Sequence, residues 1–165
     1  MKISLTRRYS FAASHRLFRA GWSDAQNHRV FGKCANPYGH GHNYAVEITV
    51  TGPVDPATGM IVNLADLDEL IRSKVLDDFD HVYLNEQVPE FRECVPTTEN
   101  LCRVIFQRLS GFKQARIERV RIEETGKNSF EYIAESGAAP KEALHAGREV
   151  SLNFMNRDNS SQNSN

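Results

Sequence analysis

Cysteine, net charge and long apolar runs are all scarce in this sequence. Three cysteines occur among 165 residues, and this odd count favours free thiols in a reducing compartment over a disulfide framework. Lysine and arginine number 20 against 21 aspartates and glutamates, which gives a net charge of -1. Without a strong global field, we expect no binding to nucleic acid or to an anionic membrane, so an anionic substrate would need local charges.

The apolar segments are too short to span a membrane, and the polar, basic residues 1–8 lack the apolar core of a signal peptide. We therefore expect a cytoplasmic protein. With 40% hydrophobic residues, the chain suffices for one compact domain. The composition changes near its end, so we expect one domain over 1–137 and a partly disordered C-terminal extension over 138–165.

Hydrophobic periodicity predicts strands and helices in the same domain. Polar and apolar residues alternate over 3–17 and 42–50, and two further strands over 119–124 and 130–134 are predicted to form a hairpin. One helix is predicted after the cap Asn63, and a second over 96–111. This order indicates an α+β fold.

Three histidines form the candidate metal site. His40 and His42 point to the same face of the second strand, because side chains alternate along a strand. His15 lies on an otherwise apolar face of the first strand. Three histidines would leave one position of a tetrahedral zinc ion open for water or substrate, as in catalytic sites. On spacing alone, however, His40 and His42 are also typical of a surface loop, and His15 of a hydrogen-bonded strand histidine.

Other polar residues suggest proton transfer. Cys34 could act as a general base if a histidine and a carboxylate lowered its pKa, and the adjacent Asp80 and His81 supply that pair. Alternatively, Cys34 is a further zinc ligand. Glu124 is predicted on the apolar face of its strand, unless the strand ends there and the carboxylate reaches water.

Six segments carry a specific resemblance to a known family. They are Phe11 to Leu17, Phe31 to Tyr44, Gly59 to Leu67, Asp80 with His81, Pro96 to Asn100, and Glu124 with Thr125. In order and spacing they resemble the 6-pyruvoyltetrahydropterin synthase and 6-carboxytetrahydropterin synthase family over residues 2–137. The resemblance implies a tunnelling fold (T-fold) with a four-stranded antiparallel sheet and two helices. Three such subunits would close a barrel, and two trimers would stack into a hexamer.

The resemblance also implies a role for each candidate residue. The implied zinc ligands are His15, His40 and His42, and the implied general base is Cys34, which Asp80 and His81 of a neighbouring subunit would activate. The implied residue that binds the pterin ring is Glu124. Thr97, Thr98 and Glu99 are implied to lie near the ring. The implied substrate is 7,8-dihydroneopterin triphosphate. Arg7, Arg16 and Lys33 are candidates for binding its triphosphate.

Two products are possible within the family. Pyruvoyl enzymes carry five residues between the cysteine and the His-Gly-His motif, as Cys34 and His40 do here, whereas typical carboxy enzymes carry three. The spacing favours 6-pyruvoyltetrahydropterin with elimination of triphosphate. The alternative is 6-carboxytetrahydropterin with release of acetaldehyde and triphosphate, in queuosine biosynthesis. A side-chain-cleaving member with glutamate in place of the cysteine is disfavoured by Cys34.

Two functions of other classes also fit parts of the pattern. The same histidines could hold a structural zinc in a non-enzymatic binding module, which a fourth protein ligand would close. A zinc hydrolase would need a carboxylate beside the metal-bound water, and the sequence has no His-Glu-x-x-His motif.

Overall fold

The computed structural model describes residues 3–135. The predicted C-terminal extension over 138–165 lies outside the described residues. The elements are β1 (Ile3–His15), α1 (Asp24–Phe31), η1 (Gly32–Ala35), β2 (His40–Gly52), α2 (Leu64–Ile71), η2 (Arg72–Leu76), α3 (Asp77–Phe79), β3 (Val82–Tyr83), α4 (Leu84–Gln87), η3 (Pro89–Arg92), α5 (Thr98–Leu109), β4 (Arg116–Thr125) and β5 (Asn128–Ile133).

One sheet organises these elements, in the strand order β3-β1-β2-β4-β5. The four predicted strands are confirmed as β1, β2, β4 and β5, and all their pairings are antiparallel. The predicted count of four was wrong, because β3 adds a fifth strand that pairs parallel to β1. With only two residues, β3 has no periodicity that the sequence could reveal.

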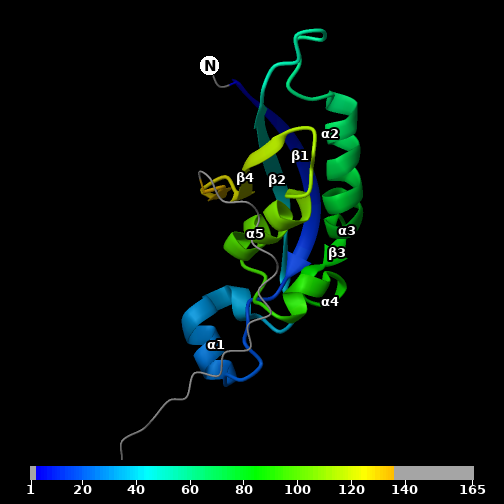
Figure 1. The fold of residues 1–165 in the computed structure, drawn as a ribbon. Coiled ribbons are helices and arrows are strands. Elements are labelled where there is room, and N and C mark those ends of the chain that lie inside the picture. Colours follow the sequence, from blue (N-terminus) through cyan, green and yellow to red (C-terminus); the bar gives the residue numbers. More distant parts are fainter. Residues whose placement is uncertain (1–2, 136–165) are drawn as a thin grey trace, which may run out of the picture.

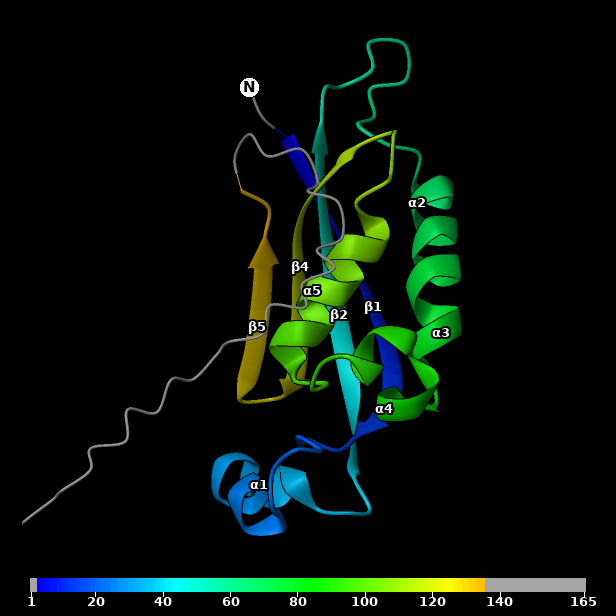
Figure 2. The same ribbon diagram turned by 60° about the horizontal axis from the view of Figure 1, so that its bottom comes forward.

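Helices α2 and α5 lie on the same side of the sheet (Figures 1 and 2). Both predicted helix starts are confirmed: Asn63 accepts a hydrogen bond from the Ala65 amide at 2.9 Å, and Thr97 caps α5. The prediction of two helices was incomplete, since residues 3–135 also contain α1, α3, α4 and the short helical segments η1, η2 and η3. Within residues 3–135, no helix is long and apolar enough to cross a membrane.

The two faces of the sheet differ in polarity. On the helix side, alternate residues such as Phe11, Tyr44 and Ile122 are buried in the core. On the other side, charged side chains pair across the strands; Arg8, for example, bonds Glu47 on β2 at 2.8 Å. The core therefore lies between the sheet and α2 and α5, and the polar end of that layer holds the candidate site.

The connection between β1 and β2 contains structure that periodicity did not predict. It contains α1, which starts with a capping box in which Ser23 and Gln26 bond each other's backbone. Asn27 is buried there and donates to the carbonyls of Arg19 and Trp22 at 3.1 and 3.3 Å. Figure 1 shows α1 projecting beyond the end of the sheet, and the segment that follows it carries Cys34.

Candidate metal centre and active site

The three predicted histidines lie together at one end of the core. The antiparallel register places His15 opposite His40 and Ala13 opposite His42. One ring nitrogen from each histidine lies within 4.8 Å of the others, and the Nε2 atoms of His15 and His40 are 3.1 Å apart. The strand pairing thus gathers three imidazoles that are far apart in sequence.

A glycine makes the turn into this cluster possible. Gly39 has a positive φ of 67°, and a Cβ atom there would lie 2.9 Å from the carbonyl oxygen of His15. A larger residue would push the start of β2 away from β1. Gly39 therefore allows His40 to sit directly opposite His15.

Hydrogen bonding prepares His15 as a ligand. The Pro96 carbonyl accepts a hydrogen bond from His15 Nδ1 at 2.8 Å, which leaves Nε2 as the unprotonated nitrogen that faces His40. His15 is 1% exposed, and burial lowers its pKa to about 4. Burial also lowers the pKa of His40. Both rings are therefore neutral near pH 7, the form that binds a metal ion.

Two further ring nitrogens make no hydrogen bond to the described part of the chain, residues 3–135. His40 Nδ1 and His42 Nε2 are buried, and neither makes a hydrogen bond among residues 3–135. Burying an unsatisfied polar atom costs free energy unless a ligand or water compensates. The three converging imidazoles, together with a His42 Nε2 that makes no hydrogen bond within residues 3–135, fit a zinc ion.

Glu124 borders the histidines from β4. Its Oε1 accepts a hydrogen bond from Thr98 Oγ1 at 2.6 Å and lies 3.8 Å from His42 Nε2. The side chain is 16% exposed, and the strand continues to Thr125. The carboxylate therefore turns toward the site, contrary to the alternative in which it ends the strand and reaches water.

The three residues at the start of α5 that were predicted to lie near the ring make different contacts. Thr97 accepts a hydrogen bond from the Asn100 amide and so caps the helix. Thr98 is buried against Glu124, whereas Glu99 is exposed in the first turn. Only Thr98 of these three bonds a residue of the site.

Cys34 lies in η1, partly buried. Burial raises the pKa of its thiol, and the negative charge of Glu124 raises it further. Among residues 3–135, the cluster able to hold a metal comprises the three histidines without Cys34. This grouping argues against the alternative in which the thiol is a ligand.

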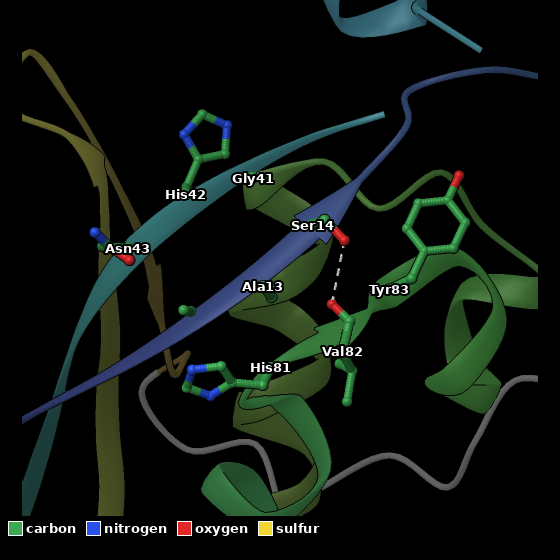
Figure 3. A pocket seen from close by; sticks show the side chains of 9 residues that line it. Ala13, Ser14, Gly41, His42, Asn43, His81, Val82 and Tyr83 are labelled. Atoms are coloured by element: carbon green, nitrogen blue, oxygen red, sulfur yellow. Dashed lines mark hydrogen bonds between the residues drawn. The ribbon is translucent and has the colours of Figure 1, made fainter. Parts of the chain in front are cut away.

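Asp80 and His81 contact each other but face elsewhere. Asp80 Oδ1 lies 2.9 Å from His81 Nδ1 and accepts a hydrogen bond from the Ala12 amide at 2.8 Å; this hydrogen bond holds the pKa of Asp80 below its ordinary value. The His81 side chain is 81% exposed, with a positive φ of 60° that is uncommon outside glycine. In Figure 3 its ring and that of His42 lie on opposite sides of β1.

The hollow beside His81 has a volume of about 420 Å³. Ala12, Ser14 and Asn43 line it, and so does the candidate metal ligand His42. His81 and His42 therefore border one hollow, whereas Cys34 is not among the residues that line it. The pair is left open to another molecule.

The geometry agrees with the comparison to known proteins. The sequence profile of 6-pyruvoyl tetrahydropterin synthase matches residues 4–135. The chain belongs to the 6-pyruvoyl tetrahydropterin synthase family. It is 46% identical over 132 residues to the 6-pyruvoyl tetrahydrobiopterin synthase of Poecilia reticulata, covering 79% of this chain and 90% of that protein.

Two other members place this chain within the synthase family. The solved structure of the Caenorhabditis elegans 6-pyruvoyl tetrahydropterin synthase has a TM-score of 0.77 at 40% identity and covers 81% of this chain and 96% of that one. The 6-carboxy-5,6,7,8-tetrahydropterin synthase of Haemophilus influenzae is 26% identical over 121 residues, with 61% and 84% coverage. The pterin synthase fold is thus shared, and the pyruvoyl relative is nearer in sequence.

Some contacts of this candidate site could not be seen in the sequence. The Pro96 carbonyl that orients His15 is a backbone group, and no residue pattern marks it. The resemblance placed Thr98 near the pterin ring, but its hydrogen bond to Glu124 was not predicted. Arg7, a candidate for binding triphosphate, instead forms two hydrogen bonds to Asp68 on α2, at 3.1 and 2.6 Å.

Proposed function

We propose that this chain is a zinc-dependent 6-pyruvoyltetrahydropterin synthase that eliminates triphosphate from 7,8-dihydroneopterin triphosphate. The observation that carries the proposal is the convergence of His15, His40 and His42 beside Glu124 and Cys34. The family membership supports the pterin substrate. We further propose a cytoplasmic lyase that works as a trimer or a dimer of trimers.

The three histidines would hold the zinc ion. Bound there, zinc would supply Lewis acidity to the side-chain oxygens of the substrate. Pro96 keeps His15 in the tautomer that offers Nε2. Three histidines would leave a coordination position for substrate, which a closed structural zinc would not.

Glu124 would orient the pterin ring. A carboxylate accepts hydrogen bonds from paired N-H donors, and Thr98 holds one of its oxygens in place. This arrangement would set the substrate side chain over the histidines, because Glu124 Oε1 lies 3.8 Å from His42. Ring binding and side-chain chemistry thus belong to adjacent parts of the site.

Cys34 would move the proton. In one chain, burial and Glu124 both raise the pKa of its thiol, so a thiolate needs an opposing influence. Positive charge at the metal centre would supply one, and an Asp80-His81 pair from a neighbouring subunit another. The exposed position of His81 supports the shared site.

Sequence distance and motif spacing support the pyruvoyl product. The relative at 46% identity is named for pyruvoyl chemistry and the relative at 26% for carboxy chemistry. The five residues between Cys34 and His40 agree with that choice. The carboxy product is therefore the second candidate.

Removing the Glu124 charge should weaken substrate binding first. A hydrogen bond to a charged group contributes about 1.5–3 kcal/mol, so we expect Glu124→Gln to raise KM by roughly ten- to a hundredfold, with a smaller fall in kcat. Steady-state kinetics on zinc-loaded protein measures both. Glu123→Gln on the other face of β4 is the matched control and should leave KM unchanged; an unchanged KM in Glu124→Gln would remove this residue from the binding site.

Mixed oligomers test whether sites are shared between subunits. Cys34→Ala chains and His81→Ala chains should each be inactive alone, and co-assembly should restore part of the activity, because some interfaces then pair an intact thiol with an intact imidazole. Each variant mixed with itself is the control. No recovery in oligomers verified to contain both chains would place His81 outside the site of another subunit.

Release of triphosphate tests enzymatic function itself. The purified, zinc-loaded protein is incubated with 7,8-dihydroneopterin triphosphate, and inorganic triphosphate is quantified over time. We expect many turnovers per chain. Stoichiometric binding without release would favour the non-enzymatic module.

A further inference from the structure

A side chain continues the sheet beyond the end of β1. Asn85, in α4, accepts a hydrogen bond from the Arg16 amide at 2.8 Å through Oδ1 and donates from Nδ2 to the Arg16 carbonyl at 2.9 Å. A primary amide offers one acceptor and two donors, so it can replace the backbone of a neighbouring strand. The amide and the carbonyl of the residue after His15 are therefore both hydrogen-bonded although β1 has ended.

The segment that follows His15 also forms hydrogen bonds to the turn that carries Cys34. The Leu17 amide donates to the Cys34 carbonyl at 2.8 Å, and Arg16 Nε donates to the Ala35 carbonyl at 3.0 Å. The Arg16 guanidinium also lies 4.4 Å from the centre of the Phe18 ring. Two consecutive carbonyls of η1 are thus fixed to the chain immediately after His15.

These contacts form one continuous path. Asn85 holds the backbone of Arg16, and Arg16 with Leu17 holds Cys34 and the buried Ala35. His15, at the start of the same segment, carries the nitrogen that faces His40. The path therefore fixes the distance between the metal ligands and the thiol.

We infer that Asn85 and Arg16 are positioning residues for Cys34, a role that rests on the proposed function. Proton transfer requires the base within about 2.6–3.2 Å of the proton it collects, directly or through one water, so a small displacement of η1 lowers turnover. The substrate and the metal need not be touched. Arg16 is thereby assigned to the turn rather than to the triphosphate, for which it was a candidate.

The test uses full-length, zinc-loaded protein with Asn85→Ala and Arg16→Lys. Both variants should lower kcat about tenfold and change KM less than threefold, with unchanged zinc content. Gln87→Ala is the matched control from the same helix, since its side chain accepts a hydrogen bond from the Tyr83 amide; its kcat should stay within twofold of the parent. A large rise in KM for Arg16→Lys would assign Arg16 to substrate binding and overturn the inference.

A double-mutant cycle separates positioning from general damage. If Asn85 acts through the thiol, Asn85→Ala should cause no further loss in a Cys34→Ala background. Losses that multiply would overturn the inference, as would loss of zinc or of folded protein in both Asn85→Ala and Arg16→Lys.

A second measurement needs no substrate. Loosening η1 should expose the partly buried thiol, so iodoacetamide should alkylate Cys34 at least threefold faster in Asn85→Ala than in the parent and in Gln87→Ala, as followed by peptide mass. Equal rates would overturn the positioning role. If the parent protein released no triphosphate, the proposed function would fail, while this alkylation rate would still decide whether Asn85 holds the turn.

Discussion

Cys34→Ala should turn over substrate roughly two orders of magnitude more slowly, or worse, the usual contribution of a positioned base. Its zinc content and pterin affinity should remain, because the cluster able to hold a metal comprises the three histidines and because we propose that Glu124 binds the ring. Metal analysis, substrate binding and single-turnover rates on the same preparation measure these three properties.

Cys94→Ser is the matched control for this experiment. Cys94 is also partly buried, and burial raises the pKa of its thiol, but its hydrogen bond goes to the Glu90 carbonyl. Turnover should stay near that of the parent. If Cys34→Ala lost its zinc instead, the thiol would be a ligand; if it turned over normally, another group would collect the proton.

His40→Ala should abolish stoichiometric zinc and with it nearly all turnover. About one zinc per chain is expected in the parent, and removal of one of three ligands leaves too few to retain a catalytic ion. His40 is a cleaner choice than His15, whose loss would also leave the buried Pro96 carbonyl without its donor. Metal analysis after dialysis, together with the melting temperature, separates loss of zinc from loss of fold.

His28→Ala provides the matched control. His28 is an exposed residue in the last turn of α1, and it is absent from the metal cluster. Its replacement should leave zinc content and turnover unchanged. Stoichiometric zinc and full activity in His40→Ala would show that the metal site had been misplaced.

The long strands and helices were predictable, because burial of one face makes apolar residues recur at a regular spacing along them. Strand β2 alternates from His42 to Val50, and its inward residues are buried as predicted. The short elements β3 and α4 have too few residues to show a period. Helix α1 has a different signal, the Ser23-Gln26 capping box, which could have revealed it.

The side chains of the site could be predicted from the sequence, whereas the backbone groups that hold them could not. Strand parity alone placed His40 and His42 on one face, and the register brought His15 to them. The carbonyls of Pro96 and Cys34 take part through hydrogen bonds, but every residue has a carbonyl. Asn85 also escaped notice, because its role depends on a contact with a residue 69 positions earlier.

The identity of the pterin product decides whether this chain is a pyruvoyl synthase. Purified, zinc-loaded protein is incubated with 7,8-dihydroneopterin triphosphate, and the pterin is analysed by mass while acetaldehyde and triphosphate are quantified. The account predicts 6-pyruvoyltetrahydropterin, with its side-chain carbons intact, equimolar triphosphate and no acetaldehyde. A 6-carboxytetrahydropterin product with equimolar acetaldehyde, or an unchanged substrate, would contradict it.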